Sequence, residues 1–156
     1  AARIACRPLH TSHAFHSAMM EPVLEPLGTA VAKTHLSPPM LPIVSTATGT
    51  WLTDTEATSP AYWTSHLRKT VLYGPAARTL LATPGRLYLE VGPRNTLVTL
   101  LRQQSPEAKQ AIVVPSLGDT AVDGAEVSAL LAAAESLAAQ GVAIDLAAVR
   151  RTLGLG

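Results

Sequence analysis

The stretch LYLEVGPRNTLVTLLRQQSPEAKQAIVVPSL, residues 87–117, decides the fold class of this 156-residue chain. LYLEVG is a short apolar run that predicts a strand, and Gly92–Pro93 ends it before a helix. The helix runs from about Thr96 to Gln104, and AIVVPSL at residues 111–117 predicts a second strand. Strands that alternate with helices are typical of an α/β architecture with a mostly parallel sheet.

The flanking sequence continues this alternation. Apolar side chains recur at helical spacing through residues 17–33, and Pro22 falls in the first turns, where a proline is tolerated. Ser59 and Pro60 form a helix start, because serine is a good N-cap and proline suits the first helical position. We therefore expect strands at residues 2–9 and 41–49, and helices at residues 17–33, 59–67, 74–82 and 124–140.

The composition excludes several classes of function. Lys and Arg total 12 against 11 Asp and Glu, and they are scattered, so nothing indicates binding to nucleic acid or to an anionic membrane. No apolar stretch approaches the roughly 20 residues that span a bilayer. The single cysteine, Cys6, cannot form an internal disulfide, which favours a reducing, soluble compartment.

The histidines of HTSHAFHSAMMEP, residues 10–22, invite a metal interpretation that their spacing does not support. In an extended segment His10 and His16 share one face while His13 points away. No neighbouring carboxylate or cysteine offers a remaining ligand for zinc. We therefore expect no metal site, and we interpret His10 and His35 as surface or structural residues.

His16 differs from the other histidines because it lies where a strand ends and a helix begins. The partial positive charge of a helix N-terminus disfavours imidazolium and so keeps a neighbouring ring neutral. A neutral imidazole is the form that acts as a general base. Phe15, beside it in the sequence, can wall a pocket that shields an intermediate from water.

Other conspicuous side chains have structural interpretations. Trp51, Tyr62 and Trp63 are interpreted as packing residues. Cys6 is interpreted as a small buried apolar residue. Glu90, the acid closest to the strand–helix junction of residues 87–104, could orient a base, but it is expected to form a salt bridge at the strand end.

Four stretches, in order along nearly the whole chain, resemble the acyltransferase domains of modular type I polyketide synthases. SHAFHSAMMEPVL at residues 12–24 resembles their HAFH signature, which is followed by Ser and an acidic-Pro segment. YWTSHLRKTVLY at residues 62–73 resembles their W-V-x-x-L-R-x-P-V-x-F stretch. YLEVGPRNTLVTLL at residues 88–101 resembles E-x-G-P-x-x-x-L, and LAAQGVAIDLAAV at residues 137–149 resembles G-V-x-V-D-W-x-x-L.

The resemblance implies a ping-pong acyl transfer through an acyl-serine intermediate. His16, the last residue of HAFH, matches the catalytic histidine that acts as general base. The position that matches the main-chain carbonyl orienting this histidine is His66. His13 and Phe15 match the positions that separate malonyl from methylmalonyl enzymes, since a bulky Phe15 would crowd a substituent on the extender.

The resemblance also implies substrates and partners. No tightly bound cofactor is expected. The substrates would be malonyl-CoA and the phosphopantetheine thiol of an acyl carrier protein. Partners would be the N-terminal half of the acyltransferase domain, the carrier protein, and the adjacent ketosynthase and linker domains, in the cytoplasm.

The sequence departs from the family pattern in ways that bear on activity. No Gly-x-Ser-x-Gly occurs in these 156 residues, so the nucleophile of the family is expected outside them, and the chain alone is expected to be inactive. Thr70 and Leu146 replace the usual Pro and Trp of two motifs.

We therefore interpret the chain as the C-terminal half of such a domain, part of an α/β-hydrolase-like acyltransferase fold. Residues 1–16 would end the ferredoxin-like small subdomain, carrying its last strand and the catalytic histidine. Residues 17–118 would return into the large subdomain, and residues 119–156 would hold the C-terminal helix and the start of the following linker.

Two alternatives stay open. The chain could be a non-catalytic docking or scaffold element, which would have no need of a histidine beside an aromatic pocket wall. It could also belong to a stand-alone malonyl-CoA:acyl carrier protein transacylase of fatty-acid synthesis. GVAIDLAAVRRTLG, at residues 141–154, favours the modular synthase.

Overall fold

The computed structural model describes residues 11–118 and 124–155. The chain divides into two compact units, Ala1–Thr79 and Leu80–Gly156, and each is described here by itself. The strand expected at residues 2–9 lies outside the described residues, as do His10 and Cys6. No helix within the described ranges is long and apolar enough to cross a membrane.

The helix expected at residues 17–33 is two elements. A 3-10 helix, η1, covers Ala18–Val23, and the α-helix α1 covers Leu24–Ala32. Pro22 lies inside η1, where it lacks the N–H that a backbone hydrogen bond needs. The two elements adjoin without a break, so the predicted extent of the helix is confirmed, and only the 3-10 form of its first six residues was not predicted. Met20 is the buried residue of η1.

Two short helices begin at residues that cap their N-termini. The helix α2, Asp54–Ala57, begins with a capping box in which Thr53 and Glu56 bond reciprocally. The helix α3, Pro60–His66, begins as predicted, with Ser59 as N-cap and Pro60 at the first position. The sequence analysis missed α2, although Thr53 and Glu56 have the spacing of a capping box.

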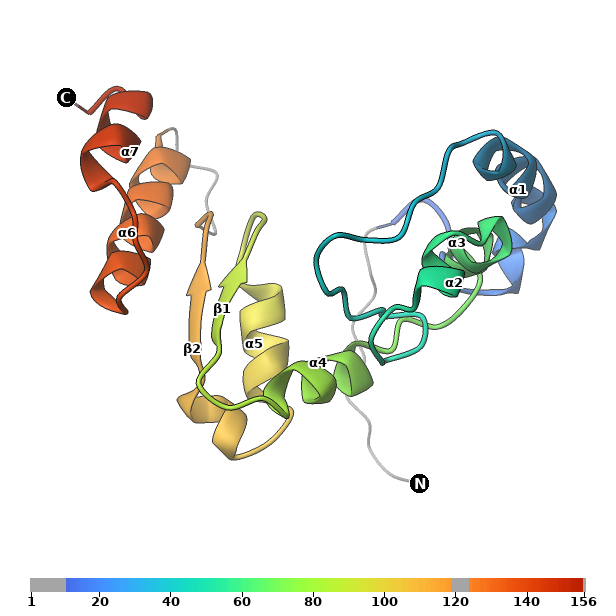
Figure 1. Cartoon of the computed structure of the whole chain (residues 1–156), viewed down its shortest axis with the longest axis horizontal. Helices are drawn as coiled ribbons and strands as arrows, with labels where there is room; N and C mark the ends of the chain where they lie inside the picture. The colour runs from blue at the N-terminus through green and yellow to red at the C-terminus, as the bar shows by residue number, and fades with distance from the viewer. Residues whose placement is uncertain (1–10, 119–123, 156) are drawn as a thin grey trace. The chain divides into compact units, whose positions relative to one another are not determined.

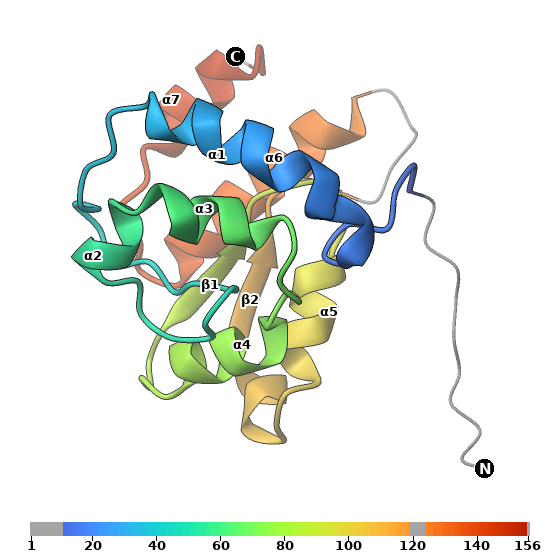
Figure 2. The same cartoon turned by 90° about the vertical axis from the view of Figure 1, so that its right-hand side faces the viewer.

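Helices α1 and α3 lie side by side in the first unit (Figure 2). Gly28 of α1 faces Thr64 of α3, and a Cβ there would lie 3.4 Å from Oγ1 of Thr64. That distance is an ordinary contact, so the packing of the two helices leaves room for an alanine at position 28.

The strand expected at residues 41–49 does not form. An isolated antiparallel bridge pairs Val44 with Trp51, and the chain between them turns back on itself. Gly49 closes the turn with a φ of 78°, and a Cβ there would lie 2.6 Å from the Cβ of Pro75 in α4, Tyr73–Leu81. The turn residues thus outweigh the apolar run 41–44, and the strand prediction was wrong.

The second unit holds the parallel sheet that the sequence predicts. Strand β1, Leu87–Glu90, pairs in parallel with β2, Ile112–Pro115, and Leu87 lies opposite Ile112. Between them the chain forms α5, Thr96–Arg102, and a 3-10 helix η2, Glu107–Gln110. Figure 1 shows α5 and α6, Ala125–Ala139, on opposite sides of the strand pair.

The last helix, α7, covers Leu146–Thr152 and contacts α6. Asp145 caps it by accepting a hydrogen bond from the N–H of Ala148, and Arg150 forms an ion pair with Glu135 of α6. The core of this unit is small and apolar. It consists of Val98, Leu101, Ala108, Val114, Ala133 and Ala134.

Candidate functional site

The segment that carries His16 is a series of tight turns. No strand forms in residues 11–17, so the strand end expected at His16 is not seen in that part of the chain. The N–H of Phe15 donates to the carbonyl of His13, and His16 follows with a φ of 61°. Such a left-handed backbone is uncommon for a residue with a side chain, so the surrounding contacts must hold it.

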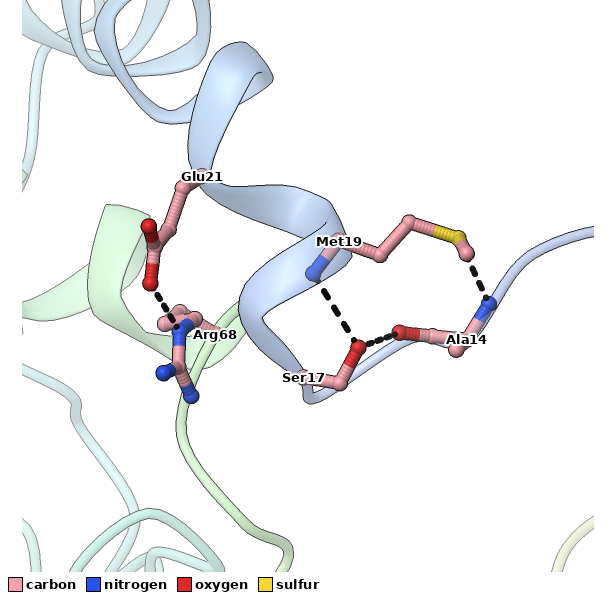
Figure 3. Close-up of polar contacts among 5 residues, drawn as sticks. All are labelled: Ala14, Ser17, Met19, Glu21 and Arg68. Carbon is pink, nitrogen blue, oxygen red and sulfur yellow. Dashed lines mark hydrogen bonds and ion pairs between the residues drawn. The ribbon is translucent and has the colours of Figure 1, made fainter.

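Contacts on both sides of His16 fix this backbone (Figure 3). The hydroxyl of Ser17 donates to the carbonyl of Ala14 at 2.6 Å and accepts from the N–H of Met19 at 3.2 Å. The sulfur of Met19 lies 3.4 Å from the N of Ala14 and accepts its hydrogen bond. Ser17 therefore both caps η1 and closes the turn that presents His16.

The His16 ring binds to backbone carbonyls at the end of α3. Its Nδ1 lies 2.9 Å from the carbonyl oxygen of His66 and 2.9 Å from that of Lys69. The backbone N–H of His16 donates to the carbonyl of Leu67 at 3.0 Å. The last carbonyls of a helix have no partner within it, so His16 satisfies groups that the helix leaves free.

These contacts define the tautomer of the His16 ring. A carbonyl oxygen can only accept, so Nδ1 must carry the hydrogen and donate. In the neutral ring, Nε2 then holds a lone pair and can accept a proton. His16 directly precedes Ser17, the N-cap of η1, as the sequence predicts, but its polar contacts are made with carbonyls at the C-terminal end of α3.

His66 itself lies in a group of rings on α3. Its ring centroid is 4.7 Å from that of Tyr62, edge-on, and 5.5 Å from that of Trp63, with which it stacks at 23°. Burial lowers the pKa of His66, and the charges of Lys69 and His16 lower it further. The His66 Nε2 is buried with no hydrogen-bond partner among the described residues.

The candidate substrate-binding residues lie in the turn before His16. The ring centroids of His13 and Phe15 are 6.1 Å apart, and Phe15 is 50% exposed. The Nδ1 of His13 lies 2.9 Å from the hydroxyl oxygen of Ser12. His13 and Phe15 thus lie in the same series of turns as His16, and their role in substrate choice stays a prediction.

An ion pair joins the two segments that carry His16 and His66. Nε of Arg68 lies 2.9 Å from Oε1 of Glu21, and both side chains are about half exposed (Figure 3). Both residues lie inside motifs of the sequence, at positions to which the motifs assign no role. Their opposite charges were the only signal available for pairing them.

Glu90 has a different partner from the salt bridge that the sequence predicts. Its carboxylate accepts hydrogen bonds from the N–H groups of Leu97 at 3.0 Å and Val98 at 2.9 Å. It therefore caps the N-terminus of α5, where the partial charge of the helix favours an anion. Nearby, Gly92 ends β1 and donates its N–H to the hydroxyl of Ser116.

The other residues that the sequence analysis named lie in packing contacts or at the surface. Tyr62 and Trp63 pack as predicted, and each is also anchored through its polar atom, Tyr62 to Ser45 and Trp63 to the carbonyl of Ala57. His35 is exposed. Within the described ranges, no group of three His, Cys, Asp or Glu side chains is arranged to hold a metal ion.

The fold is that of acyltransferase domains, which confirms the predicted α/β class. The acyltransferase domain from the second module of the salinomycin polyketide synthase has a TM-score of 0.78 and 30% identity, over 92% of this chain and 32% of that one. The malonyl CoA-acyl carrier protein transacylase from Clostridium perfringens has a TM-score of 0.70, over 86% of this chain and 39% of that one. At 19% identity the second likeness concerns the fold alone.

The homologues of the chain are polyketide synthase proteins. The spectinabilin polyketide synthase system protein NorB of Streptomyces orinoci is 36% identical over 141 residues, which is 88% of this chain and 6% of NorB. The chain therefore spans a small part of such a relative and about a third of the solved salinomycin domain. No family model matches the sequence.

Proposed function

We propose that this chain is part of a polyketide synthase acyltransferase that moves an extender unit from coenzyme A to an acyl carrier protein. The observation that carries the proposal is the His16 ring, whose Nδ1 donates to the carbonyls of His66 and Lys69. This arrangement leaves Nε2 as the acceptor, as a general base requires. The likeness to acyltransferase domains supplies the reaction class.

In the proposed first half-reaction, Nε2 of His16 takes the proton of a serine hydroxyl that lies outside this chain. The serine oxygen bonds to the thioester carbonyl carbon, and the carbon–sulfur bond to coenzyme A breaks. The proton on His16 passes to the departing sulfur. An acyl-serine ester and free coenzyme A result.

In the second half-reaction His16 repeats its role with a different thiol. Nε2 takes the proton of the phosphopantetheine thiol, the sulfur bonds to the ester carbonyl carbon, and the carbon–oxygen bond to serine breaks. The proton on His16 returns to the serine oxygen. The backbone carbonyls at Nδ1 keep the ring in one orientation throughout, as an orienting carboxylate does in other serine enzymes.

Malonyl is the extender that we propose, on the identity of His13 and Phe15, which precede the base in the HAFH segment. Phe15 is bulky and half exposed at the turn that presents His16, so its ring can crowd a substituent on the extender. The proposed partners are the remaining half of the domain, the acyl carrier protein, and the adjacent ketosynthase and linker domains. We propose that the reaction takes place in the cytoplasm, without a tightly bound cofactor.

The test joins this chain to the upstream half of its domain and measures acylation by labelled malonyl-CoA. His16→Ala should lower the acylation rate by about 10² to 10⁴-fold, the usual contribution of a general base. His35→Ala, which removes an exposed histidine, is the matched control and should change little. Equal losses in both variants, or full activity in a folded His16→Ala protein, would contradict the proposal and favour a scaffold role.

A further inference from the structure

The orientation of His16 depends on where the end of α3 lies. All three carbonyls that hold His16 belong to residues 66, 67 and 69. The helix has seven residues, too few to be rigid without tertiary contacts. Whatever fixes its last turn also fixes the ring of His16.

The rings on α3 connect this last turn to two anchored points. Trp63 donates its indole N–H to the carbonyl of Ala57 at 2.8 Å, at the end of α2. Tyr62 donates its hydroxyl to Ser45, which is buried in the turn after residue 44. His66 packs against both rings and is one turn of helix beyond Tyr62, so it transmits their position to its own carbonyl.

We propose that the side chain of His66 is a positioning residue: its ring, packed against Tyr62 and Trp63, holds the end of α3 so that two carbonyls meet Nδ1 of His16. This inference rests on the proposed role of His16 as the base. It goes beyond the sequence analysis, which assigned the task to the His66 backbone alone.

The surroundings of His66 indicate that it acts as a flat ring and not as an acid or base. Its Nε2 is buried without a partner among the described residues, so a proton there would have no acceptor. Burial and the charges of Lys69 and His16 lower its pKa, which keeps the ring uncharged at neutral pH. A phenyl ring should therefore replace the imidazole, whereas an aliphatic side chain should not.

The experiment measures the His16 tautomer by ¹⁵N NMR in the 156-residue chain with labelled histidines. In the unmodified chain the Nδ1–H form should dominate for the neutral ring. His66→Leu should lower the ratio of Nδ1–H to Nε2–H by about tenfold, the factor that one hydrogen bond commonly contributes. His66→Phe should restore the ratio, and His35→Leu is the matched control.

Two results would overturn the inference. One is an unchanged His16 tautomer in folded His66→Leu, and the other is a His66→Phe protein that behaves like His66→Leu. If His66→Leu does not fold, Trp63→Leu removes the stacked ring and should shift the tautomer in the same way. No acyl transfer is needed for this measurement, so its outcome is separate from that of the acylation test.

Discussion

Replacing Glu90 by alanine should destabilise the second unit, because this carboxylate caps α5. The carboxylate accepts two backbone hydrogen bonds, at 3.0 Å from Leu97 and 2.9 Å from Val98, and Glu90 is only 8% exposed. A hydrogen bond to a charged group contributes about 1.5–3 kcal/mol. The bond from Val98 is buried, so its N–H would stay unsatisfied, whereas the bond from Leu97 is only partly buried and water can partly replace it.

The expected loss in the free energy of unfolding is therefore about 2–4 kcal/mol for Glu90→Ala. Glu90→Gln keeps one acceptor oxygen without the charge, so it loses one of the two bonds and should lower the free energy of unfolding by about 1.5–3 kcal/mol. Glu126→Ala is the control, since Glu126 is an exposed acid in the first turn of α6 and contributes at most about 1 kcal/mol.

Urea unfolding followed by circular dichroism measures these differences. Amide hydrogen exchange of the N–H of Val98 adds a local measurement, because exchange reports the opening of the segment that holds the amide. Glu90→Ala should accelerate that exchange while leaving α3 unaffected. If Glu90→Ala unfolds at the same urea concentration as Glu126→Ala, the capping explanation is wrong.

Four further predictions follow from the same contacts. Gly49→Ala should lower the thermal midpoint, because Gly49 has a φ of 78° and a Cβ there would lie 2.6 Å from the Cβ of Pro75. Gly28→Ala should raise the thermal midpoint, because alanine has the higher helix propensity and its Cβ would make only a 3.4 Å contact. The free energy of unfolding should fall as pH drops below 6.5, because the pKa of His66 is lower in the folded chain than in the unfolded chain, which therefore takes up the proton first. Urea titrations at several pH values should show a weaker pH dependence for His66→Phe. In the complete domain, His13→Tyr with Phe15→Ser should raise the methylmalonyl-to-malonyl ratio in a competition assay by up to about 200-fold, and an unchanged ratio in an active protein would remove Phe15 from the extender site. The 156-residue chain alone should form no stable ester with labelled malonyl-CoA, since it holds a base and no matching serine elbow.

Local chemistry accounts for the predictions that the structure confirms. Ser59 and Pro60 start α3 because a cap bonds to a neighbour a few residues away, which the sequence alone specifies. The strand, helix and strand of residues 87–117 form a parallel pair, as their alternation predicts. The strand predicted at residues 41–49 was wrong because a turn that Gly49 closes overrode the apolar run.

The residues that meet His16 could be located only in part. The motif resemblance pointed to the carbonyl of His66, 50 residues along the chain, and the structure places that oxygen 2.9 Å from Nδ1. The carbonyl of Lys69 had no signal at all, because every residue has the same backbone oxygen. The ring contacts of His66 were not predicted, because Tyr62 and Trp63 were interpreted only as packing residues and their packing partner was not identified.

The sequence by itself determined the α/β class, the parallel strand pair and the Ser59 cap of α3, and its resemblance to a known family indicated the candidate base. The class, the strand pair and the cap depend on periodicity and on bonds between near neighbours, which the order of residues specifies. Only the tertiary structure decided that His16 donates from Nδ1, that the ring of His66 stacks on Trp63, and that Glu90 caps a helix. The contacts of His16 and Glu90 depend on atoms from separate segments meeting within about 3 Å, the range of a hydrogen bond, and folding alone sets those distances. The rings of Trp63 and His66 lie on one helix, and their contact depends on the side-chain orientations that the folded structure fixes.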